Sequence, residues 1–225
     1  MSMNLAKSYD FFKPEDLKER IHIIGCGSVG STVAENLARF GITKFSLYDF
    51  DHVEAHNLAN QMFTQEDIGK LKTQAVAEYI CKINPDIARD LKVYEQGYVS
   101  QKLSGYIFLC VDSIELRRKI AESYVGNPFV KGMFDFRTRL TDAQHYAADW
   151  HDPKMVQDFL NSMQFSHEEA KAATPVSACN IALSVAPTVR IICAMGVANF
   201  INFAKGEKIR KLILCDAFGF EVDAF

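Results

Sequence analysis

The sequence predicts an α/β fold whose sheet is parallel in its N-terminal half, is extended by antiparallel strands, and carries helices on both faces. Through the first 135 residues, short apolar runs alternate with segments of helical periodicity, the pattern of successive βαβ units. Beyond that point the pattern changes to a strand, two helices and a terminal hairpin. No internal repeat interrupts the 225 residues, so we expect a single domain over residues 1–225.

Strands in the first part are predicted from short β-branched or aromatic runs, at 20–25, 44–49, 91–95, 106–111 and 129–134. Helices between them are predicted from apolar residues at helical spacing, at 31–40, 64–83 and 114–124. Gly41 follows the first helix where a C-terminal stop belongs, and Asn84-Pro85 ends the second. The residues Thr64 to Asp67 are expected to cap that second helix.

The C-terminal part predicts a different arrangement. Residues 143–148 are expected to form an antiparallel strand, and 152–163 an amphipathic helix. A polar segment, 166–173, is interpreted as a crossover. The long apolar helix at 181–204 is expected either to begin or to kink at Pro187. The last elements form a hairpin of two strands, 211–215 and 218–223.

Composition excludes several functional classes. Apolar residues make up 48% and charged residues 24%, as in ordinary globular proteins, and the formal net charge of −3 provides no basic field for nucleic acid. The polar segment 1–20 lacks the apolar stretch of a signal peptide. The longest apolar run, 191–204, is expected to be too short to span a bilayer. We therefore expect a soluble, cytoplasmic protein without a membrane partner.

The cysteines form no C-x-x-C pair and lie mostly in apolar segments, at positions 26, 81, 110, 179, 193 and 215. This spacing favours free thiols in a reducing compartment over a disulfide framework or a zinc site. Core packing is the expected role for all of them except Cys179. That residue precedes the long helix, where a thiol of lowered pKa could act as a nucleophile. Simple packing of the helix start is the alternative that we favour.

A glycine loop predicts a nucleotide site and makes the fold Rossmann-like. Residues 25–30 read G-C-G-S-V-G, which matches G-x-G-x-x-G between a predicted strand and a predicted helix. The glycines Gly25, Gly27 and Gly30 allow a tight turn, and the helix N-terminus offers N–H groups to phosphate. Asp49 follows the second strand, 24 residues after Gly25, where a carboxylate accepts hydrogen bonds from ribose. These features do not distinguish NAD from ATP.

Polar residues after the later strands favour a triphosphate. Asp51, Lys72 and Asp112 would lie at the ligand crevice of a doubly wound sheet. A lysine neutralises phosphate charge and an aspartate can hold Mg²⁺, whereas hydride transfer requires neither group.

In this order, the motifs resemble those of the ThiF/MoeB/HesA superfamily, which is related to the adenylation domains of ubiquitin-activating enzymes. The superfamily pattern D-x-D-x-V-x-x-x-N-L-x-R-Q corresponds to 49–61, G-x-x-K to 69–72, and D-N-x-x-x-R to 112–117. The resemblance implies ATP-dependent adenylation of a carboxylate. It also implies a nucleotide-binding half, 1–135, a substrate-binding and dimerisation half, 136–225, and a homodimer.

The same resemblance implies roles for particular residues. Asp49 would bind ribose, Asn57 and Lys72 would contact the phosphates, and Asp112 would hold Mg²⁺; Asp51 and Gln61 would complete the ATP site. Asn57, Lys72 and Asp112 would also be the catalytic residues. The substrate would be the C-terminal glycine of a ubiquitin-like or sulfur-carrier protein, or a small carboxylate. Arg117 would orient Asp112 or pair within the fold, and Lys70 is expected to be a solvated lysine.

The sequence departs from this pattern in two places. Asn60 replaces an arginine, and the loss of that cation near the reacting phosphorus would cost about 2–4 kcal/mol of transition-state stabilisation. Arg20, Arg117 or a partner's arginine could replace it. The paired C-x-x-C motifs of many relatives are missing, so no structural zinc is expected. Two alternatives stay open: an adenylation fold that binds nucleotide without catalysis, and an NAD-dependent oxidoreductase.

Overall fold

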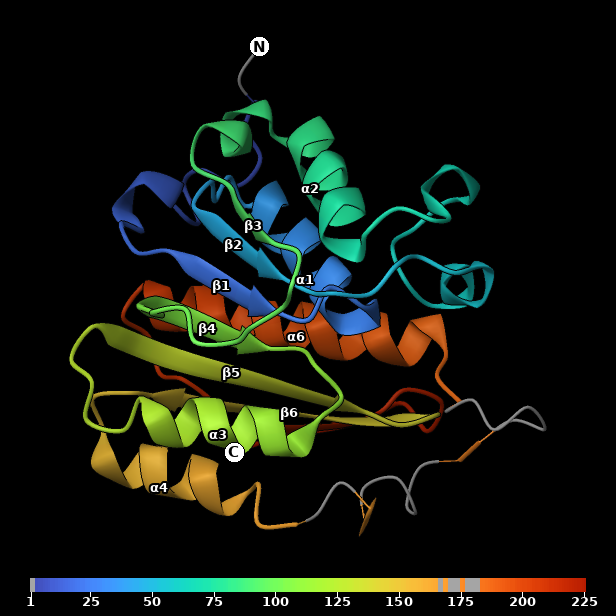
Figure 1. The fold of residues 1–225 in the computed structure, drawn as a ribbon. Coiled ribbons are helices and arrows are strands. Elements are labelled where there is room, and N and C mark those ends of the chain that lie inside the picture. Colours follow the sequence, from blue (N-terminus) through green and yellow to red (C-terminus); the bar gives the residue numbers. More distant parts are fainter. Residues whose placement is uncertain (1–2, 166–167, 170–174, 177–182) are drawn as a thin grey trace.

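A computed structural model describes residues 3–165, 168–169, 175–176 and 183–225 (Figure 1). Eight strands form one sheet in the order β3-β2-β1-β4-β5-β6-β7-β8. The strands are β1 (Ile21–Ile24), β2 (Phe45–Tyr48), β3 (Lys92–Tyr94), β4 (Gly105–Leu109), β5 (Val130–Thr138), β6 (Asp142–Asp149), β7 (Leu212–Asp216) and β8 (Glu221–Ala224). The α-helices with given bounds are α1 (Ser28–Arg39), α2 (Lys72–Ile83), α3 (Ile114–Ser123), α4 (Pro153–Asn161) and α6 (Ala186–Ala204).

The helices cover both faces of the sheet, which confirms the predicted fold class. Helices α1, α2 and α6 pack together on one face, while α3 and α4 lie on the other (Figure 1). Strands β1 to β5 pair with one another in parallel, and β6, β7 and β8 continue the sheet from β5 in antiparallel pairs.

The strand order places the carboxyl ends of three strands together. Central strand β1 lies between β2 and β4, and Ile24 is in register with both Tyr48 and Leu109. The chain passes to opposite sides of β1 after β1 and after β3, so this edge is a topological switch point of the sheet. Segments that follow β1, β2 and β4 therefore share one crevice, where doubly wound sheets bind ligands.

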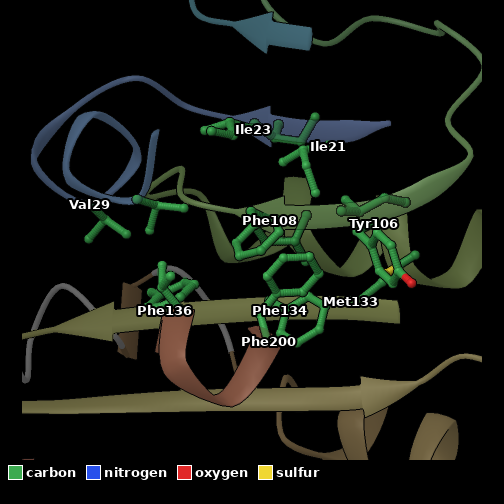
Figure 2. Close-up of a cluster of buried hydrophobic side chains, with 14 of the residues drawn as sticks. Ile21, Ile23, Val29, Tyr106, Phe108, Met133, Phe134, Phe136 and Phe200 are labelled. Atoms are coloured by element: carbon green, nitrogen blue, oxygen red, sulfur yellow. The ribbon is translucent and has the colours of Figure 1, made fainter. Parts of the chain in front are cut away.

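A cluster of aromatic side chains joins α6 to the middle of the sheet (Figure 2). The ring centroid of Phe200 lies 5.2 Å from those of both Phe108 and Phe134, with the rings near perpendicular. Edge-to-face contacts of this kind add to the free energy gained by burial. The cluster fixes α6 against β4 and β5, beside the crevice.

Helix α6 contacts both α1 and strands β5, β6 and β7, which explains its apolar composition. Its 19 residues are long and apolar enough to cross a bilayer by length and composition, contrary to the expectation from residues 191–204 alone. Half of its most apolar window is buried inside the protein. In this structure, α6 is a helix of the protein core.

Two helix starts differ from the predictions. Helix α2 begins at Lys72, because the capping box of Thr64 and Asp67 serves a separate 3₁₀ turn over Gln65–Asp67. Gly69, with φ of 88°, then separates that turn from the helix. Helix α1 begins at Ser28, inside the glycine motif, rather than at residue 31.

In the C-terminal part, Pro187 lies in the first turn of α6, so that helix begins there and does not kink. The terminal hairpin is confirmed as β7 and β8. Most of the polar segment 166–173 lies outside the described residues, as does Cys179. The other five cysteines are free thiols, buried or packed against the core.

Candidate nucleotide-binding site

The glycine loop connects β1 to α1 in a conformation that needs two of its glycines. Gly25 has φ of 96°, and a Cβ there would lie 2.7 Å from the carbonyl oxygen of Cys110. A Cβ on Gly30 would lie 1.9 Å from the carbonyl oxygen of Gly25. A Cβ on Gly27 would meet only Gln61 Oε1, at 3.9 Å. The loop is tight against β4 on one side and open over the start of α1, where a phosphate binds in such motifs.

Asp49 is fixed beside this loop by backbone hydrogen bonds. Its Oδ2 accepts a bond of 2.6 Å from the N–H of Cys26, and its Oδ1 accepts one of 2.9 Å from the N–H of Asp51. Burial raises the pKa of the Asp49 carboxyl, although both backbone donors oppose that shift. Each carboxylate oxygen retains a second lone pair, so Asp49 can also accept hydrogen bonds from ribose.

Lys72 is held at the crevice by Asp51. Its Nζ donates to Asp51 Oδ2 over 2.8 Å, and its backbone N–H donates to the Asp51 carbonyl over 2.9 Å. Lys72 is only 9% exposed, while Asp51 is exposed. The pair fixes the first residue of α2 to the segment after β2. A cation in this position can neutralise a phosphate group.

Lys70, expected from the sequence to be a solvated lysine, lies before α2 and is held in ion pairs instead. Its Nζ forms ion pairs with Asp67 at 3.0 Å and with Glu78 at 2.7 Å. These carboxylates belong to the 3₁₀ turn and to the outer part of α2.

Asn57 and Gln61, two of the amides after Asp51, differ in their hydrogen bonds. Asn57 is buried, and its Oδ1 accepts the N–H of Glu54 in a capping box at the 3₁₀ turn Ala55–Ala59. Only its amide nitrogen can serve a phosphate. Gln61, in contrast, has a buried Oε1 with no hydrogen-bond partner among the described residues. That orphaned atom faces the open side of Gly27, so the crevice retains a polar group that a ligand could satisfy.

Asp112 follows β4 and is exposed. The Nε of Arg117 donates to the carbonyl of Val111 over 2.7 Å, which holds the residue before Asp112. The same guanidinium forms a buried ion pair with Asp135. Arg117 thus pairs within the fold and acts on Asp112 only through the backbone.

The polar groups of the crevice fit ATP, and a Mg²⁺ ion would have to arrive with the nucleotide. Within the described ranges, no group of three His, Cys, Asp or Glu side chains could hold a metal. Protein sites for Mg²⁺ commonly supply one or two carboxylates and take the other ligands from phosphate and water. Asp112 could be such a carboxylate.

Two residues considered as replacements for the arginine missing at position 60 are placed elsewhere. Arg20 lies before β1, at the opposite end of that strand from the glycine loop, and pairs with Asp90. Arg117 is buried against Asp135. An arginine that the motifs did not indicate, Arg190 of α6, contacts Met62 beside the loop. No motif marks Arg190, since α6 lies far along the chain from the glycine loop and meets α1 only through the packing of the core.

The fold and this crevice define a Rossmann-like α/β domain with a glycine loop at the switch point of its sheet. A profile of the ThiF family matches residues 13–224, and the chain therefore belongs to the ThiF family.

The sequence is similar to ubiquitin-like modifier-activating enzyme 5 from several organisms. It is 31% identical over 134 residues to the Drosophila persimilis protein, which covers 52% of this chain and 34% of the relative. The Dictyostelium discoideum protein is 33% identical over 117 residues, or 45% of this chain and 31% of the relative. The chain thus spans about a third of the length of these relatives.

Solved structures share the fold over nearly the whole chain. Escherichia coli MccB with ATP superposes with a TM-score of 0.74 at 16% identity, covering 94% of this chain and 65% of MccB. PaaA gives a TM-score of 0.70 at 17% identity, with the same coverage of 94% and 65%.

Proposed function

We propose that this chain uses ATP to adenylate a carboxylate and releases pyrophosphate. The observation that carries this proposal is the convergence of Asp49, the Asp51–Lys72 pair and the glycine loop at the carboxyl ends of neighbouring parallel strands. Membership of the ThiF family supports it, as does the shared fold with MccB, which has been solved with ATP.

In the proposed reaction, a carboxylate oxygen attacks the α-phosphorus of ATP. The new bond joins that oxygen to the α-phosphorus, and the bond to the bridging oxygen breaks, with its electron pair leaving on pyrophosphate. Negative charge grows on the phosphate oxygens, and the ammonium of Lys72 opposes it in the crevice. Mg²⁺, when bound at Asp112, would neutralise further phosphate charge.

The site residues divide into two groups by task. Gly25, Gly27, Gly30 and Asp49 bind the nucleotide, while Asn57 and Gln61 supply polar groups along the phosphates. Lys72, Asp112 and Asn57 stabilise the transition state, while Asp51 and Lys72 also belong to the nucleotide site.

Substrate-dependent ATP–pyrophosphate exchange tests the proposal. Candidate substrates are ubiquitin-like and sulfur-carrier proteins with C-terminal glycine, and small carboxylates; relatives named as ubiquitin-like modifier-activating enzymes favour the protein class. The MccB structures determined with MccA support trials with peptides as well. Exchange that depends on one of these carboxylates is the expected result, and ATP binding without exchange for any of them contradicts it.

A second candidate function is nucleotide binding without catalysis. Asn60 favours it, because an amide brings neither the charge nor the bidentate geometry of an arginine to the phosphates. An oxidoreductase would instead bind NAD in preference to ATP, and competition between the two nucleotides distinguishes it.

We also propose that the chain is a cytoplasmic homodimer. Light scattering of the purified chain measures the oligomeric state.

A further inference from the structure

An arginine of α6 lies beside the loop that carries Asn60. The Nη1 of Arg190 contacts the Sδ of Met62, two residues after Asn60. The backbone N–H of Met62 donates to the hydroxyl of Ser31, in the first turn of α1, over 3.3 Å. One turn further along α6, the Cys193 thiol lies 3.7 Å from a carbonyl of the same turn of α1. Helix α6 passes beside α1 (Figure 1), and through Met62 the Arg190 side chain lies next to the first turn of α1, where the glycine loop ends.

The guanidinium of Arg190 is weakly held. Its closest carboxylate among the described residues is Glu35, with 3.8 Å between Nη1 and Oε2. The other oxygen of Glu35 already accepts bonds from Arg39, at 2.9 Å, and from Tyr79, at 3.2 Å. A thioether is a weak acceptor, so the contact with Met62 holds the cation little. The Arg190 side chain is 38% exposed, and a surface pair of this kind costs little to break.

Four other arginines either form bonds of their own or lie away from the crevice. Arg20 and Arg117 are excluded by their positions, as described above. Arg137 donates to Asp135 at 2.6 Å and to the carbonyl of Ser162 at 2.7 Å. Arg139, at the turn from β5 to β6, lies two strands away from β1. Within the described part of the chain, none of these four contacts the loop around Asn60.

We propose that Arg190 binds the phosphate groups of ATP and so supplies, from α6, the arginine that this chain lacks at position 60. This inference rests on the proposed function. A guanidinium offers a permanent charge and two parallel N–H donors to phosphate, which Asn60 does not. Because Arg190 approaches from the helix that covers α1, its charge reaches the crevice without any change in the loop sequence. Bound phosphate would take the guanidinium from Glu35 and Met62.

Binding of Mg·ATP and of adenosine, measured by calorimetry on the purified chain, tests the assignment. Arg190→Gln is expected to weaken ATP binding roughly ten- to a hundredfold, the effect of losing a hydrogen bond to a charged group. Adenosine has no phosphate, so its affinity should not change. Arg39→Gln is the matched control: it removes another arginine from Glu35 but lies in the last turn of α1. This control should bind ATP as the wild type does.

A rescue experiment tests whether the two positions serve one purpose. Asn60 is half-buried. Asn60→Arg in the Arg190→Gln background is expected to restore at least half of the lost ATP binding free energy.

Each contrary result overturns the inference. If Arg190→Gln binds ATP with unchanged affinity, Arg190 does not contact the phosphate groups. If it loses affinity for ATP and adenosine equally, Arg190 supports the structure rather than the phosphates. If Asn60→Arg does not restore ATP binding, positions 60 and 190 do not serve the same purpose. A wild-type chain that binds no ATP overturns the proposed function itself, which the wild-type measurement decides independently of any variant.

Discussion

Lys70 and Lys72 stand two residues apart and differ in burial, partners and direction. Lys70 is held by two carboxylates on the outer side of α2, whereas Lys72 is buried against Asp51 at the crevice. Lys70 precedes α2, which begins only at Lys72, so the two side chains do not belong to one helix. The motif G-x-x-K indicated Lys72, which lies at the same edge of the sheet as the glycine loop.

Replacement of Lys72 should therefore impair catalysis. Lys72→Ala is expected to lower the rate of ATP–pyrophosphate exchange by about two orders of magnitude, because a cation that opposes developing phosphate charge is lost. ATP affinity should also fall. Lys70→Ala, measured in parallel with the same carboxylate, should retain close to the wild-type rate. Equal losses in both variants would contradict the distinction.

Asp49 allows a test of nucleotide binding that needs no carboxylate substrate. Asp49→Ala should weaken ATP binding by about 1.5–3 kcal/mol, as expected for hydrogen bonds to a charged group. Asp158→Ala, which removes an exposed carboxylate from α4, is the control. Calorimetric titration with Mg·ATP provides the measurement, with circular dichroism to verify folding. An Asp49 variant that binds ATP normally would remove Asp49 from the site.

The proposed role of Asp112 in holding Mg²⁺ depends on a single carboxylate and can be tested by one substitution. Asp112→Ala should lower exchange by about two orders of magnitude while ATP still binds through the loop and Asp49. Raising the Mg²⁺ concentration should recover part of the rate if the variant binds the ion more weakly. A variant that exchanges as fast as the wild type would contradict the assignment.

At the scale of single elements, prediction from sequence succeeded where periodicity is local. The strands at the middle of the sheet were predicted within a few residues, because buried β-branched runs have few alternatives. The start of α2 was wrong, because the capping box of Thr64 and Asp67 has the same residues whether a long helix or one 3₁₀ turn follows. Gly69 decided between these outcomes through a positive φ that its residue type permits but does not require.

Helix α6 is held against the sheet by buried aromatic side chains, so its packing should contribute to stability. Phe200 is fully buried among Phe108 and Phe134, whereas Phe220 is 92% exposed. Phe200→Ala should lower the free energy of unfolding by about 3–5 kcal/mol, from lost burial and the cavity left behind. Phe220→Ala, the same change at the surface, should alter it by less than about 0.5 kcal/mol. Urea unfolding followed by tryptophan fluorescence and circular dichroism compares the two.

At the scale of the whole molecule, the site arises from topology rather than from one segment. The sequence indicated that Asp49, Lys72 and Asp112 follow successive elements, and the parallel pairing of β1 with β2 and β4 brings their segments to one edge. Sequence reasoning missed Arg190, because contact between α6 and α1 joins residues far apart in the chain.

The pH dependence of stability is also a property of the whole sheet, through two histidines buried in it. Burial lowers the pKa of His22 in β1 and of His145 in β6 to about 4 each. His145 is fully buried, with Nδ1 3.1 Å from the carbonyl of Asp135 and Nε2 3.2 Å from Nδ2 of Asn199. Protonation would place a charge in this apolar region, which desolvation strongly disfavours.

The sign of the effect follows from the unfolded chain, where a histidine has a pKa of about 6.5. Above that pH, His145 is neutral in both states and contributes no pH dependence. Between pH 6.5 and 4, the unfolded chain takes up a proton that the folded chain refuses, so the free energy of unfolding falls by up to about 1.4 kcal/mol per pH unit for this residue. His145→Gln should remove that part of the slope, whatever its effect at pH 7. His151→Gln, at an exposed position, should keep the wild-type slope. Unfolding by urea at pH 7, 6 and 5 measures all three proteins, and parallel curves for His145→Gln and wild type would mean that His145 accepts its proton in the folded sheet.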